Sequence, residues 1–494
     1  MSSDFGAILL RGTDLQTGLI SRLAGAIHDK RHPSYISHSM TDLLRQRVFQ
    51  SACGYADGND ANALRADPMF KLAAGRAPLD ADTDLASGPT LSRLENSLTR
   101  RDIYRLAKSF VSACGYADGN DANALRADPM FKLAAGRAPL DADTDLASGP
   151  TLSRLENNLT RRDIYRLAKS FVHAFIDSYA QAPALIVLDM DHSEDLTHGQ
   201  QELAFYNHHY RHHCYMPLFL FEGLSGKLIT AILRPGKRPT GRENAAIIAR
   251  VVRALRQAWP DTHIILRGDG HFSNPELMAL CEQDPAMDFI FGLAGNKVLL
   301  PLAQPLLERA KSHYQSRCES ARHLGLPAPG ATRLYDDLSY QAGTWRVVLK
   351  AEVMALGENP RFVVSSLNEP TAELLYRELY CARGQDENYI KAIKNDLASD
   401  RTSDHTFLAN HMRMFYACAA YVLIHSLREN TLAHTELARA QPGTIILKLF
   451  KLAVRVVQYK DRIRLSLPTG CPVKGILERV TELLYQTQRP PAPA

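Results

Sequence analysis

The middle of the chain, from residue 183 to residue 293, alternates between short apolar runs and segments with helical spacing. Short apolar runs bounded by Gly, Pro, Asp or Ser are typical of strands, whereas apolar residues at intervals of three and four are typical of an amphipathic helix. A polar turn over residues 222–226 joins two of the runs and predicts a hairpin. The predicted strands are residues 184–188, 216–221, 227–233, 263–266 and 288–293, and the clearest helix is residues 242–259.

This order of elements is a strand, a hairpin of two strands, a helix, a strand, a helix and a strand, which is the ribonuclease H-like order. It predicts an α/β fold in which the strands that end at Asp191 and Asp269 are neighbours. Open sheets covered by helices place their sites at strand ends. Two carboxylates brought together there repel each other unless a cation lies between them, and hard oxygen ligands suit Mg²⁺ or Mn²⁺. Asp189 faces the same way as Asp191 on the strand, so it stays open as the alternative ligand.

A third carboxylate, which a two-metal phosphoryl-transfer site requires, lies in a predicted helix further along the chain. Tyr380, Arg383, Glu387, Lys391 and Lys394 follow one another at intervals of three or four. Such residues share one face of a helix. A carboxylate among an aromatic ring, an arginine and two lysines fits a residue that holds a metal beside DNA phosphates.

The N-terminal part of the chain contains a direct repeat of 61 residues. Residues 51–111 recur as residues 112–172, and the copies differ only where Ser97 becomes Asn158. Functional repeat arrays normally diverge, so we interpret this repeat as a recent in-frame duplication. The junction between the copies predicts a continuous helix over residues 101–116, with one copy docked in the fold and the other bulging out.

Each repeat unit is itself predicted to be mostly helical. Ser87 is a plausible cap for one short helix, and a second helix begins near Thr99. Two short helices joined by a tight turn resemble a helix-turn-helix, although such pairs are more common as plain packing units. The residues placed to read base edges in the DNA-binding interpretation are Thr90, Ser92 and Arg93.

Charge adds a second indication of a nucleic-acid partner. The net charge of +5 is weak by itself, but residues 441–494 carry nine Lys or Arg and only three Asp or Glu. Several of these cations lie on an apolar, strand-like stretch that suits a surface laid along phosphates. A solvated face of an ordinary sheet is the alternative. The cations of this stretch are Lys451, Arg455, Lys460, Arg462 and Arg464.

Composition argues against several other classes of protein. The chain is 45% hydrophobic and 22% charged, as in ordinary globular proteins. The apolar segment 415–427 contains tyrosines and a histidine, so it is predicted to be a buried helix and not a membrane span. Eight cysteines without a C-x-x-C pair indicate neither a disulfide framework nor a zinc finger and suggest a reducing cytoplasm. The first residues lack the basic and apolar regions of a signal peptide.

The helix around Glu387 carries a known signature. Tyr380, Arg383, Glu387 and Lys394 fit the pattern Y-x-x-R-x-x-x-E-x-x-x-x-x-x-K without a gap. Behind two strand-end aspartates, this signature resembles the Y-R-E-K branch of bacterial insertion-sequence DDE transposases. The chain as a whole looks like the group numbered thirteen-eighty, except that the family has one copy of residues 51–111. Further resembling segments are 31–47, 188–191, 198–202, 214–218, 267–269 and 361–364.

The resemblance implies a DNA transposase that cuts the ends of an insertion sequence and joins them to a target. Asp191, Asp269 and Glu387 would hold two Mg²⁺ or Mn²⁺ ions. Arg383, Lys391 and Lys394 would grip phosphates, and Tyr380 would pack on the DNA end. The implied partners are double-stranded DNA with terminal inverted repeats, target DNA and a second copy of the chain, in the bacterial cytoplasm at the nucleoid and without a membrane.

The patterns and the resemblance together predict four regions. Residues 1–50 form an N-terminal helical segment, and residues 51–172 form the duplicated helical DNA-binding region. Residues 183–430 form the ribonuclease H-like catalytic core, with a strand-rich insertion around residues 294–360 before the last catalytic helix. Residues 431–494 form a basic C-terminal region.

Several alternatives remain open at this level. His208 and His212 could meet on one helix face and bind zinc, although no second ligand pair is found and substrate contact or surface placement fits better. Trp345 could stack on an extruded base, although an aromatic residue in a strand is more often in the core. Two competing functions are a ribonuclease H-like DNA nuclease and a DNA-binding relic inactivated by the duplication.

Overall fold

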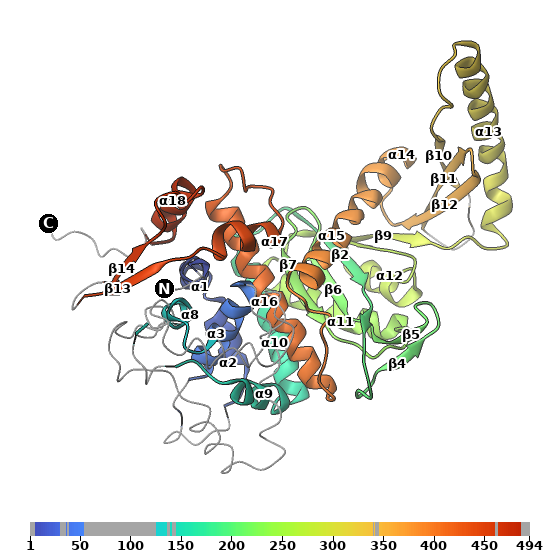
Figure 1. Cartoon of the computed structure of the whole chain (residues 1–494). Coiled ribbons are helices and arrows are strands. Elements are labelled where there is room, and N and C mark those ends of the chain that lie inside the picture. Colours follow the sequence, from blue (N-terminus) through green and yellow to red (C-terminus); the bar gives the residue numbers. More distant parts are fainter. Residues whose placement is uncertain are drawn as a thin grey trace.

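The computed structural model describes residues 5–29, 36, 39–53, 125–135, 139–140, 145–338, 340, 345–459 and 463–485. Figure 1 shows that these residues form a helical part near the N-terminus, a part built on a large β-sheet, and an arm that projects from the sheet. The fold is therefore a mixed α/β fold. The sheet part carries Asp191 and Asp269, and its topology decides how the two carboxylates meet.

The large sheet is mixed and has eight strands in the order β10-β11-β12-β9-β8-β2-β6-β7. β2 is parallel to β8 and β8 is parallel to β9, whereas the other neighbours are antiparallel. Along the chain, the first five strands and the helices between them follow the order expected from the sequence. The strands are β2 (Leu185–His192), β6 (Leu218–Glu222), β7 (Leu228–Ile232), β8 (His263–Gly268), β9 (Met287–Leu293), β10 (Thr332–Leu338), β11 (Arg346–Met354) and β12 (Gly357–Ser365).

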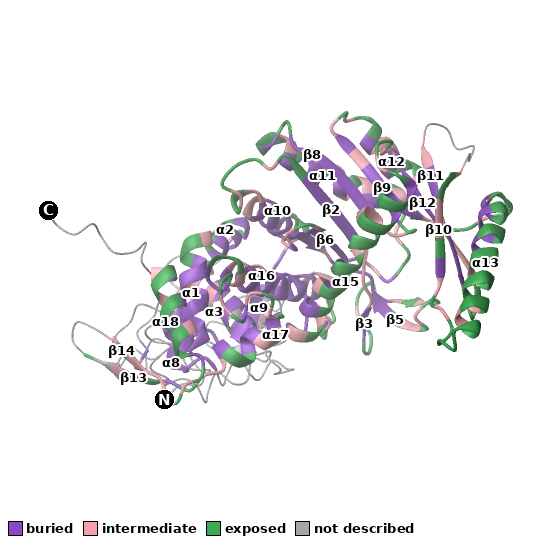
Figure 2. Ribbon diagram, turned by 90° about the horizontal axis from the view of Figure 1, so that it is seen from above, coloured by how far each residue is buried: buried purple, intermediate pink, exposed green. Residues whose placement is uncertain are grey.

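The two faces of the sheet are covered by different helices, because side chains alternate along each strand. Ile186, Leu188 and Met190 of β2 belong to an apolar cluster with α11 (Gly241–Ala258) and α12 (Pro275–Glu282). Val187 belongs to a separate cluster on the other face. Asp189 and Asp191 share the Val187 face by this alternation. Figure 2 shows the central strands buried beneath helices whose outer surfaces are exposed.

The start of α11 illustrates how local sequence fixes these elements. Thr240 Oγ1 accepts a hydrogen bond from the Glu243 amide (3.3 Å), and the Glu243 carboxylate accepts one from the Thr240 amide (2.8 Å). This reciprocal capping box satisfies two amide donors at the helix end. The helix therefore begins at a fixed residue, and its apolar side is held against the sheet.

The arm in Figure 1 lies between β9 and the last helices of the sheet part. It consists of the long helix α13 (Leu299–His323) and the antiparallel strands β10, β11 and β12. β12 pairs with β9, so the arm extends the central sheet at its β9 edge. Trp345 precedes β11, and its indole Nε1 donates a hydrogen bond to Glu282 (2.7 Å). Its ring meets Phe289 edge-on at 6.1 Å, so Trp345 is a packed residue in this structure.

The sequence predicts one regular helix around Glu387, but the structure has a helical run with altered turns. π-helical turns η4 (Leu375–Tyr380) and η6 (Ala392–Asp396) flank the regular helix α15 (Gly384–Lys391), and η5 (Cys381–Arg383) is a 3₁₀ turn. Each change of helix type rotates the following side chains relative to a regular helix. Intervals of three and four therefore do not keep all five signature residues on a single face.

The helical part packs around α16 (Phe407–Thr431), whose residues are mostly buried. By length and composition, α16 is the one helix among the described residues that could cross a membrane, but 83% of its apolar window is buried inside the fold. Core helices of soluble proteins pass the same test. The position of α16 agrees with the interpretation of residues 415–427 as a buried helix.

The second repeat copy is packed into the helical part. Residues 51–53 of the first copy end α3 (Met40–Cys53), and the next residues that the structure describes begin at Leu125 of the second copy. There, Ser148 caps α9 (Gly149–Asn157) and Thr160 caps α10 (Arg161–Asp177). These are the second-copy counterparts of the two predicted helices. The predicted helix over residues 101–116 and the first copy's Thr90, Ser92 and Arg93 lie outside the described residues.

The packing of this copy bears on the helix-turn-helix interpretation. Thr151 and Arg154, the counterparts of Thr90 and Arg93, are buried. Burial lowers the pKa of Arg154 to about 9. In the second copy, a base-reading role for these two side chains is therefore wrong, because they do not reach the surface.

The C-terminal residues form α17 (Pro442–Ile445), the π-helical turn η7 (Ile446–Phe450), a hairpin of β13 (Arg455–Gln458) and β14 (Ile463–Ser466), and α18 (Lys474–Tyr485). Arg455 and Arg464 are exposed on this hairpin. Lys460 and Arg462 lie outside the described residues. The predicted strand-like basic stretch is thus a two-stranded ribbon that is separate from the large sheet.

Candidate active site

Asp191 and Asp269 meet at the ends of two parallel strands. In the register of β2 with β8, Asp189 lies beside Arg267 and Met190 lies beside Gly268. The next residues along the two strands are Asp191 and Asp269, so both carboxylates follow the last paired positions. The edge of the sheet therefore carries two acids at one place, as expected from the strand pattern.

Each of these two carboxylates is held by a nearby donor. Asp191 Oδ2 accepts from Arg383 Nη1 (3.2 Å), and Asp191 Oδ1 accepts from the His192 amide (2.9 Å). Asp269 Oδ1 accepts from the His271 amide (2.9 Å), and Asp269 Oδ2 lies 3.0 Å from His271 Nδ1. His271 was not predicted from the sequence, although its position two residues after a strand-end aspartate was a usable signal.

The electrostatic surroundings of the two acids differ. Burial raises the pKa of Asp191 to about 6; Arg383 opposes this shift, and the charges of Asp269 and Glu387 add to it. Burial also acts to raise the pKa of Asp269, but the hydrogen bonds and charge of His271 outweigh it and leave that pKa lowered. At Asp191, burial and the two neighbouring acids therefore outweigh the opposing charge of Arg383, and a bound cation would stabilise its charged form.

The helical run brings the third acid and the cations to this edge. Glu387 lies on α15 with its side chain 56% exposed, and its carboxylate is 3.8 Å from Lys391 Nζ. Lys394 Nζ donates to Ser193 Oγ (3.1 Å) and to the Glu194 carbonyl, directly after the end of β2. Arg383 and Lys394 thus both reach the end of the Asp191 strand, whereas Lys391 points to solvent with Glu387.

Tyr380, the remaining signature residue, is half-buried. Its ring lies 5.5 Å from the ring of Tyr376, and a Cβ at Gly292 of β9 would come within 2.6 Å of its hydroxyl oxygen. Burial raises the pKa of the Tyr380 hydroxyl, and the charge of Asp269 adds to the shift. Tyr380 therefore closes one side of the acidic edge.

Asp189 has a different environment from Asp191. Its side chain is fully buried, and both carboxylate oxygens accept hydrogen bonds from the Arg267 guanidinium. A Cβ at Gly223 would collide with this carboxylate, so the hairpin turn closes over it. Asp386 of α15 lies buried beside the pair, and burial raises its pKa to about 9, with the charge of Asp189 adding to the shift.

The Asp189–Arg267–Asp386 group was not predicted from the sequence. A signal existed: aligning the strand end Asp189-Met190-Asp191 with Arg267-Gly268-Asp269 places an arginine beside the first acid and an acid beside the second. The bidentate pairing occupies both oxygens of the Asp189 carboxylate with donors of one buried guanidinium. The oxygens of Asp191 instead accept from two different groups, Arg383 and the His192 amide.

The three acids of the candidate site are of the ligand type that a divalent cation prefers. Carboxylate oxygens at a strand end are the hard ligands that Mg²⁺ and Mn²⁺ prefer, and a cation would offset the burial of Asp191 and its repulsion by the neighbouring acids, so the chemistry fits. Within the part of the chain that the structure describes, no three His, Cys, Asp or Glu side chains lie close enough together to hold a metal. Arg383, His271 and Lys391 instead contact the three acids.

The zinc alternative for the histidine cluster required His208 and His212 to lie on one face of a helix. The expected helix is wrong. His208 follows β4 (Phe205–Asn207), and His212 begins β5 (His212–Tyr215), so the two residues lie on a strand-and-turn ribbon. His212 Nε2 lies 3.1 Å from Glu194 Oε2. The pairing of the two strands therefore replaces the helical spacing on which a zinc pair would depend.

Comparisons with known proteins were made on the whole chain. The family model described as transposase DDE domain group 1 matches residues 1–113 and 107–489. The matched stretches overlap around the junction of the two repeat copies. Among solved structures, a piggyBac transposase in a synaptic complex with hairpin DNA matches with a TM-score of 0.40 and 12% identity, covering 99% of this chain and 82% of that chain. No curated protein matches.

The family match extends over nearly the whole chain, including the strand ends and the helical run described above. The chain therefore belongs to the DDE transposases, which are DNA-cleaving enzymes of the polynucleotidyl-transferase type.

Proposed function

We propose that this enzyme cuts the ends of an insertion sequence and transfers them to a target, with Asp191, Asp269 and Glu387 as the catalytic acids. The observation that carries the proposal is the contact between Arg383 and Asp191 (3.2 Å). It joins the Y-R-E-K helical run to the two strand-end aspartates. The electrostatic influence of Glu387 on Asp191 further supports a common site.

We further propose that the core is ribonuclease H-like and that the chain belongs to the Y-R-E-K branch. Strands β2, β6, β7, β8 and β9 lie in the spatial order β9-β8-β2-β6-β7, with β2, β8 and β9 parallel. The segment with α13 and β10–β12 would be the insertion before the last catalytic helix. The sheet and the helical run of this proposed core lie within residues 183–430, whereas α16 of that range packs in the helical part.

In the proposed mechanism, Asp191, Asp269 and Glu387 would hold Mg²⁺ or Mn²⁺, and the complete site would take two ions. Bound metal would supply an activated water or 3′ hydroxyl for attack on a phosphodiester. Arg383 orients the Asp191 carboxylate and offers its remaining donors to a phosphate. Lys394, held at the end of β2, and Lys391, exposed beside Glu387, contact phosphates on either side of the acid. Tyr380 packs against the DNA end.

The proposed partners are duplex DNA with terminal inverted repeats, target DNA and a second copy of the chain. Exposed Arg455 and Arg464 of the β13–β14 hairpin offer a further phosphate-binding surface. We place the enzyme at the bacterial nucleoid in the cytoplasm.

The test is cleavage of a plasmid that carries the DNA flanking the gene, with purified full-length chain and Mg²⁺ or Mn²⁺. Asp269→Ala and Glu387→Ala should abolish nicking at the element ends, whereas a gel-shift assay should still show end binding. Full activity of either variant would overturn the assignment. Binding without cleavage by the unchanged chain would favour a DNA-binding relic, and cleavage without strand transfer would favour a nuclease.

A further inference from the structure

A small ribbon beside the acidic edge carries four histidines that the proposed chemistry does not use, His208, His209, His212 and His213. β5 pairs with both β3 (Asp195–Leu196) and β4, and these three short strands form a sheet of their own. We call residues 205–213 the aromatic ribbon. The turn between its strands is defined: the Arg211 amide donates to the Asn207 carbonyl (2.8 Å), and Arg211 adopts a left-handed backbone conformation.

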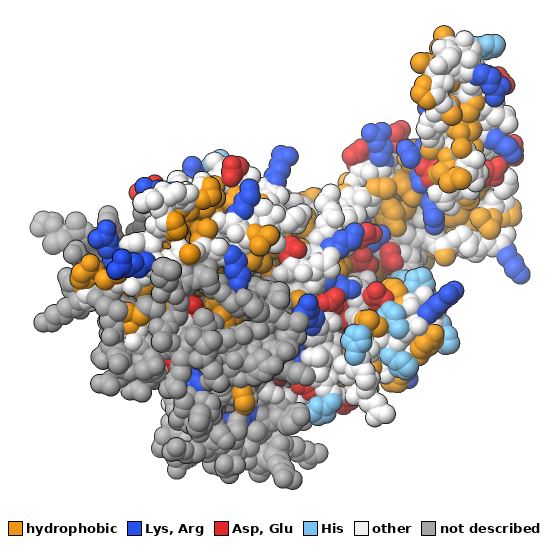
Figure 3. Space-filling model, viewed as in Figure 1, with side chains coloured by type: hydrophobic (Ala, Val, Ile, Leu, Met, Phe, Trp, Pro, Cys, Tyr) orange, Lys and Arg blue, Asp and Glu red, His pale blue; other side chains and the backbone are white. Residues whose placement is uncertain are grey.

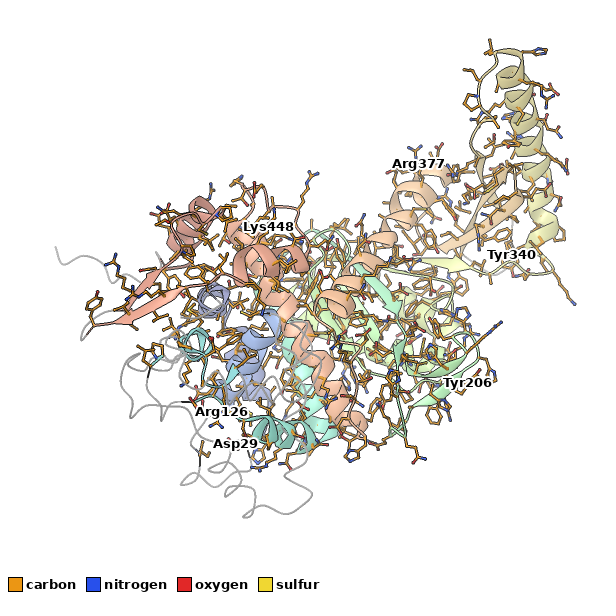
Figure 4. The ribbon with its side chains drawn as sticks, viewed as in Figure 1. Asp29, Arg126, Tyr206, Tyr340, Arg377 and Lys448 are labelled. Carbon is orange, nitrogen blue, oxygen red and sulfur yellow. The ribbon has the colours of Figure 1, made fainter. Side chains whose placement is uncertain are left out.

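The two faces of the aromatic ribbon differ in what covers them. Phe205 is paired in register with the buried Cys214, and Lys237 Nζ lies 4.3 Å from the Phe205 ring centre. Tyr206 is paired in register with His213 on the opposite face, where the Tyr206 side chain is 47% exposed. Figure 4 shows Tyr206 at the outer edge of the ribbon. One face therefore packs on the body and the other presents rings to solvent.

The rings form two groups, in which Tyr206, His208, His209 and His213 are exposed and Tyr210 and His212 are partly buried. The Tyr206 ring meets His208 at 5.2 Å and His213 at 5.6 Å, both edge-on. The Tyr210 ring meets His209 edge-on at 4.8 Å and His212 in a stacked arrangement at 6.1 Å. Figure 3 shows histidine side chains gathered over this part of the surface. These contacts hold each tyrosine ring in place before any ligand arrives.

The aromatic ribbon lies next to the candidate catalytic edge. His212 Nε2 lies within hydrogen-bonding distance (3.1 Å) of Glu194 Oε2, and Glu194 lies three residues after Asp191. Burial raises the pKa of the Tyr210 hydroxyl, and the charges of Glu194, Asp191 and Asp269 add to this shift. Tyr210 is therefore within electrostatic range of both strand-end acids. The ribbon's turn carries the exposed cation Arg211.

We propose that the aromatic ribbon binds unpaired bases of the DNA next to the scissile phosphate, with Tyr206 as the principal stacking ring and Arg211 on the backbone. The inference rests on the proposed function. Aromatic rings combined with a nearby cation are the physical means by which proteins hold single-stranded nucleic acid, because every base has a face that can stack. A DNA end held at Asp191 and Asp269 would place its adjacent bases against these rings.

The test compares two probes and four forms of the full-length chain. The probes are a short blunt duplex and the same duplex with a few unpaired bases at one end, one of them 2-aminopurine. Binding is measured by fluorescence anisotropy in EDTA, so that no cleavage occurs, and stacking is measured as quenching of 2-aminopurine. The proteins are the unchanged chain, Tyr206→Ala, Tyr206→Phe and Leu356→Ala. Leu356, between β11 and β12 of the arm, is 95% exposed and serves as a surface control.

Tyr206→Ala should weaken binding of the unpaired probe by about 5- to 100-fold and remove the quenching, which is the range expected for loss of one stacked base. Binding of the blunt duplex should change by less than about 2-fold. Tyr206→Phe and Leu356→Ala should behave like the unchanged chain. Equal effects of Tyr206→Ala on both probes, or no effect on either, would overturn the ribbon proposal.

The two proposals fail in distinguishable ways. If Tyr206→Ala leaves quenching intact while Asp269→Ala still abolishes cleavage, only the ribbon proposal is wrong. If the unchanged chain binds neither probe and cleaves no DNA in the presence of Mg²⁺ or Mn²⁺, both the proposed function and the inference built on it are wrong.

Discussion

Asp189 and Asp191 lie two residues apart on the same face of one strand, yet they occupy opposite kinds of environment. Asp189 is fully buried, and its two oxygens accept hydrogen bonds from Nε and Nη2 of Arg267. Asp191 lies at the strand end beside a second acid, and one of its oxygens accepts a hydrogen bond from Arg383. A carboxylate whose charge is already neutralised by a buried arginine stabilises the fold. A carboxylate that lacks sufficient positive charge is available to a cation.

The comparison makes metal removal the largest expected effect. EDTA should abolish DNA cleavage by the unchanged chain and by Asp189→Asn alike, since neither the Asp189–Arg267 pair nor any other described group substitutes for the ion. Restoring Mg²⁺ or Mn²⁺ in a plasmid-nicking assay should restore cleavage in both. Nicking that persists in EDTA would show that cleavage needs no metal, and it would contradict the role of Asp191 as a metal ligand.

The next effect concerns stability. Asp189→Leu should lower the free energy of unfolding by about 3 kcal/mol, because it removes the carboxylate that accepts two hydrogen bonds from the buried Arg267 guanidinium and leaves that guanidinium beside Asp386. Asp191→Asn should change it by less than about 1 kcal/mol, because it removes a negative charge that already lies beside Asp269. Urea denaturation followed by circular dichroism measures both. The double variant Asp189→Leu/Arg267→Met serves as a control and should recover part of the loss. Equal losses for the two single variants would contradict the division into a structural and a catalytic acid.

A smaller effect is expected from the repeat. All three proposed catalytic acids follow residue 172, and removal of residues 112–172 leaves one intact unit joined to His173. Two nearly identical copies compete for one docking place, so this deletion should raise transposition by about 2- to 10-fold, as a rough expectation for removing a competing folded state. A papillation assay in cells compares the two chains. Lower activity after the deletion would show that the extra copy has a role of its own.

The smallest effect is on the salt dependence of binding. Lys394→Ala and Lys391→Ala should each reduce the slope of log affinity against log salt concentration by about 1, because each lysine is proposed to displace counterions from one phosphate. Fluorescence anisotropy over a range of salt concentrations gives the slope. Lys311→Ala, on α13 of the projecting arm, provides a control at a lysine paired with Glu358. An unchanged slope in both signature variants would contradict phosphate contact by these lysines.

Much of the sheet could be predicted from the sequence, because apolar runs and turns define its strands locally. The placement of Asp191 and Asp269 at neighbouring strand ends followed from the same pattern. The separation of Asp189 from Asp191 could not be predicted in this way, because two residues two apart face the same side of a strand. It depends on the register that brings Arg267 beside Asp189, which is a non-local property.

The helical run around Glu387 and the aromatic ribbon are two further features whose local structure the sequence pattern did not predict. Intervals of three and four around Glu387 predict a regular helix, but they carry no sign of the π-helical turns η4 and η6. His208 and His212 have helical spacing but lie on paired strands and a turn, where the Asn207 side chain accepts from the His209 amide (2.9 Å). Such local side-chain bonds compete with helix formation and explain the difference.

The central claim is that Asp191, and not Asp189, belongs to the catalytic set. The most direct measurement is metal-dependent cleavage of the element ends by Asp191→Asn and Asp189→Asn, with the folded fraction of each protein determined by circular dichroism. We expect Asp191→Asn to lose cleavage activity by on the order of 10³-fold or more, which is the scale of loss when a member of a catalytic group is removed. Its binding to the element ends should persist. Asp189→Asn should keep measurable cleavage per folded molecule. Loss of cleavage in a folded Asp189→Asn protein, with activity retained in Asp191→Asn, would contradict the account and transfer the ligand role to Asp189.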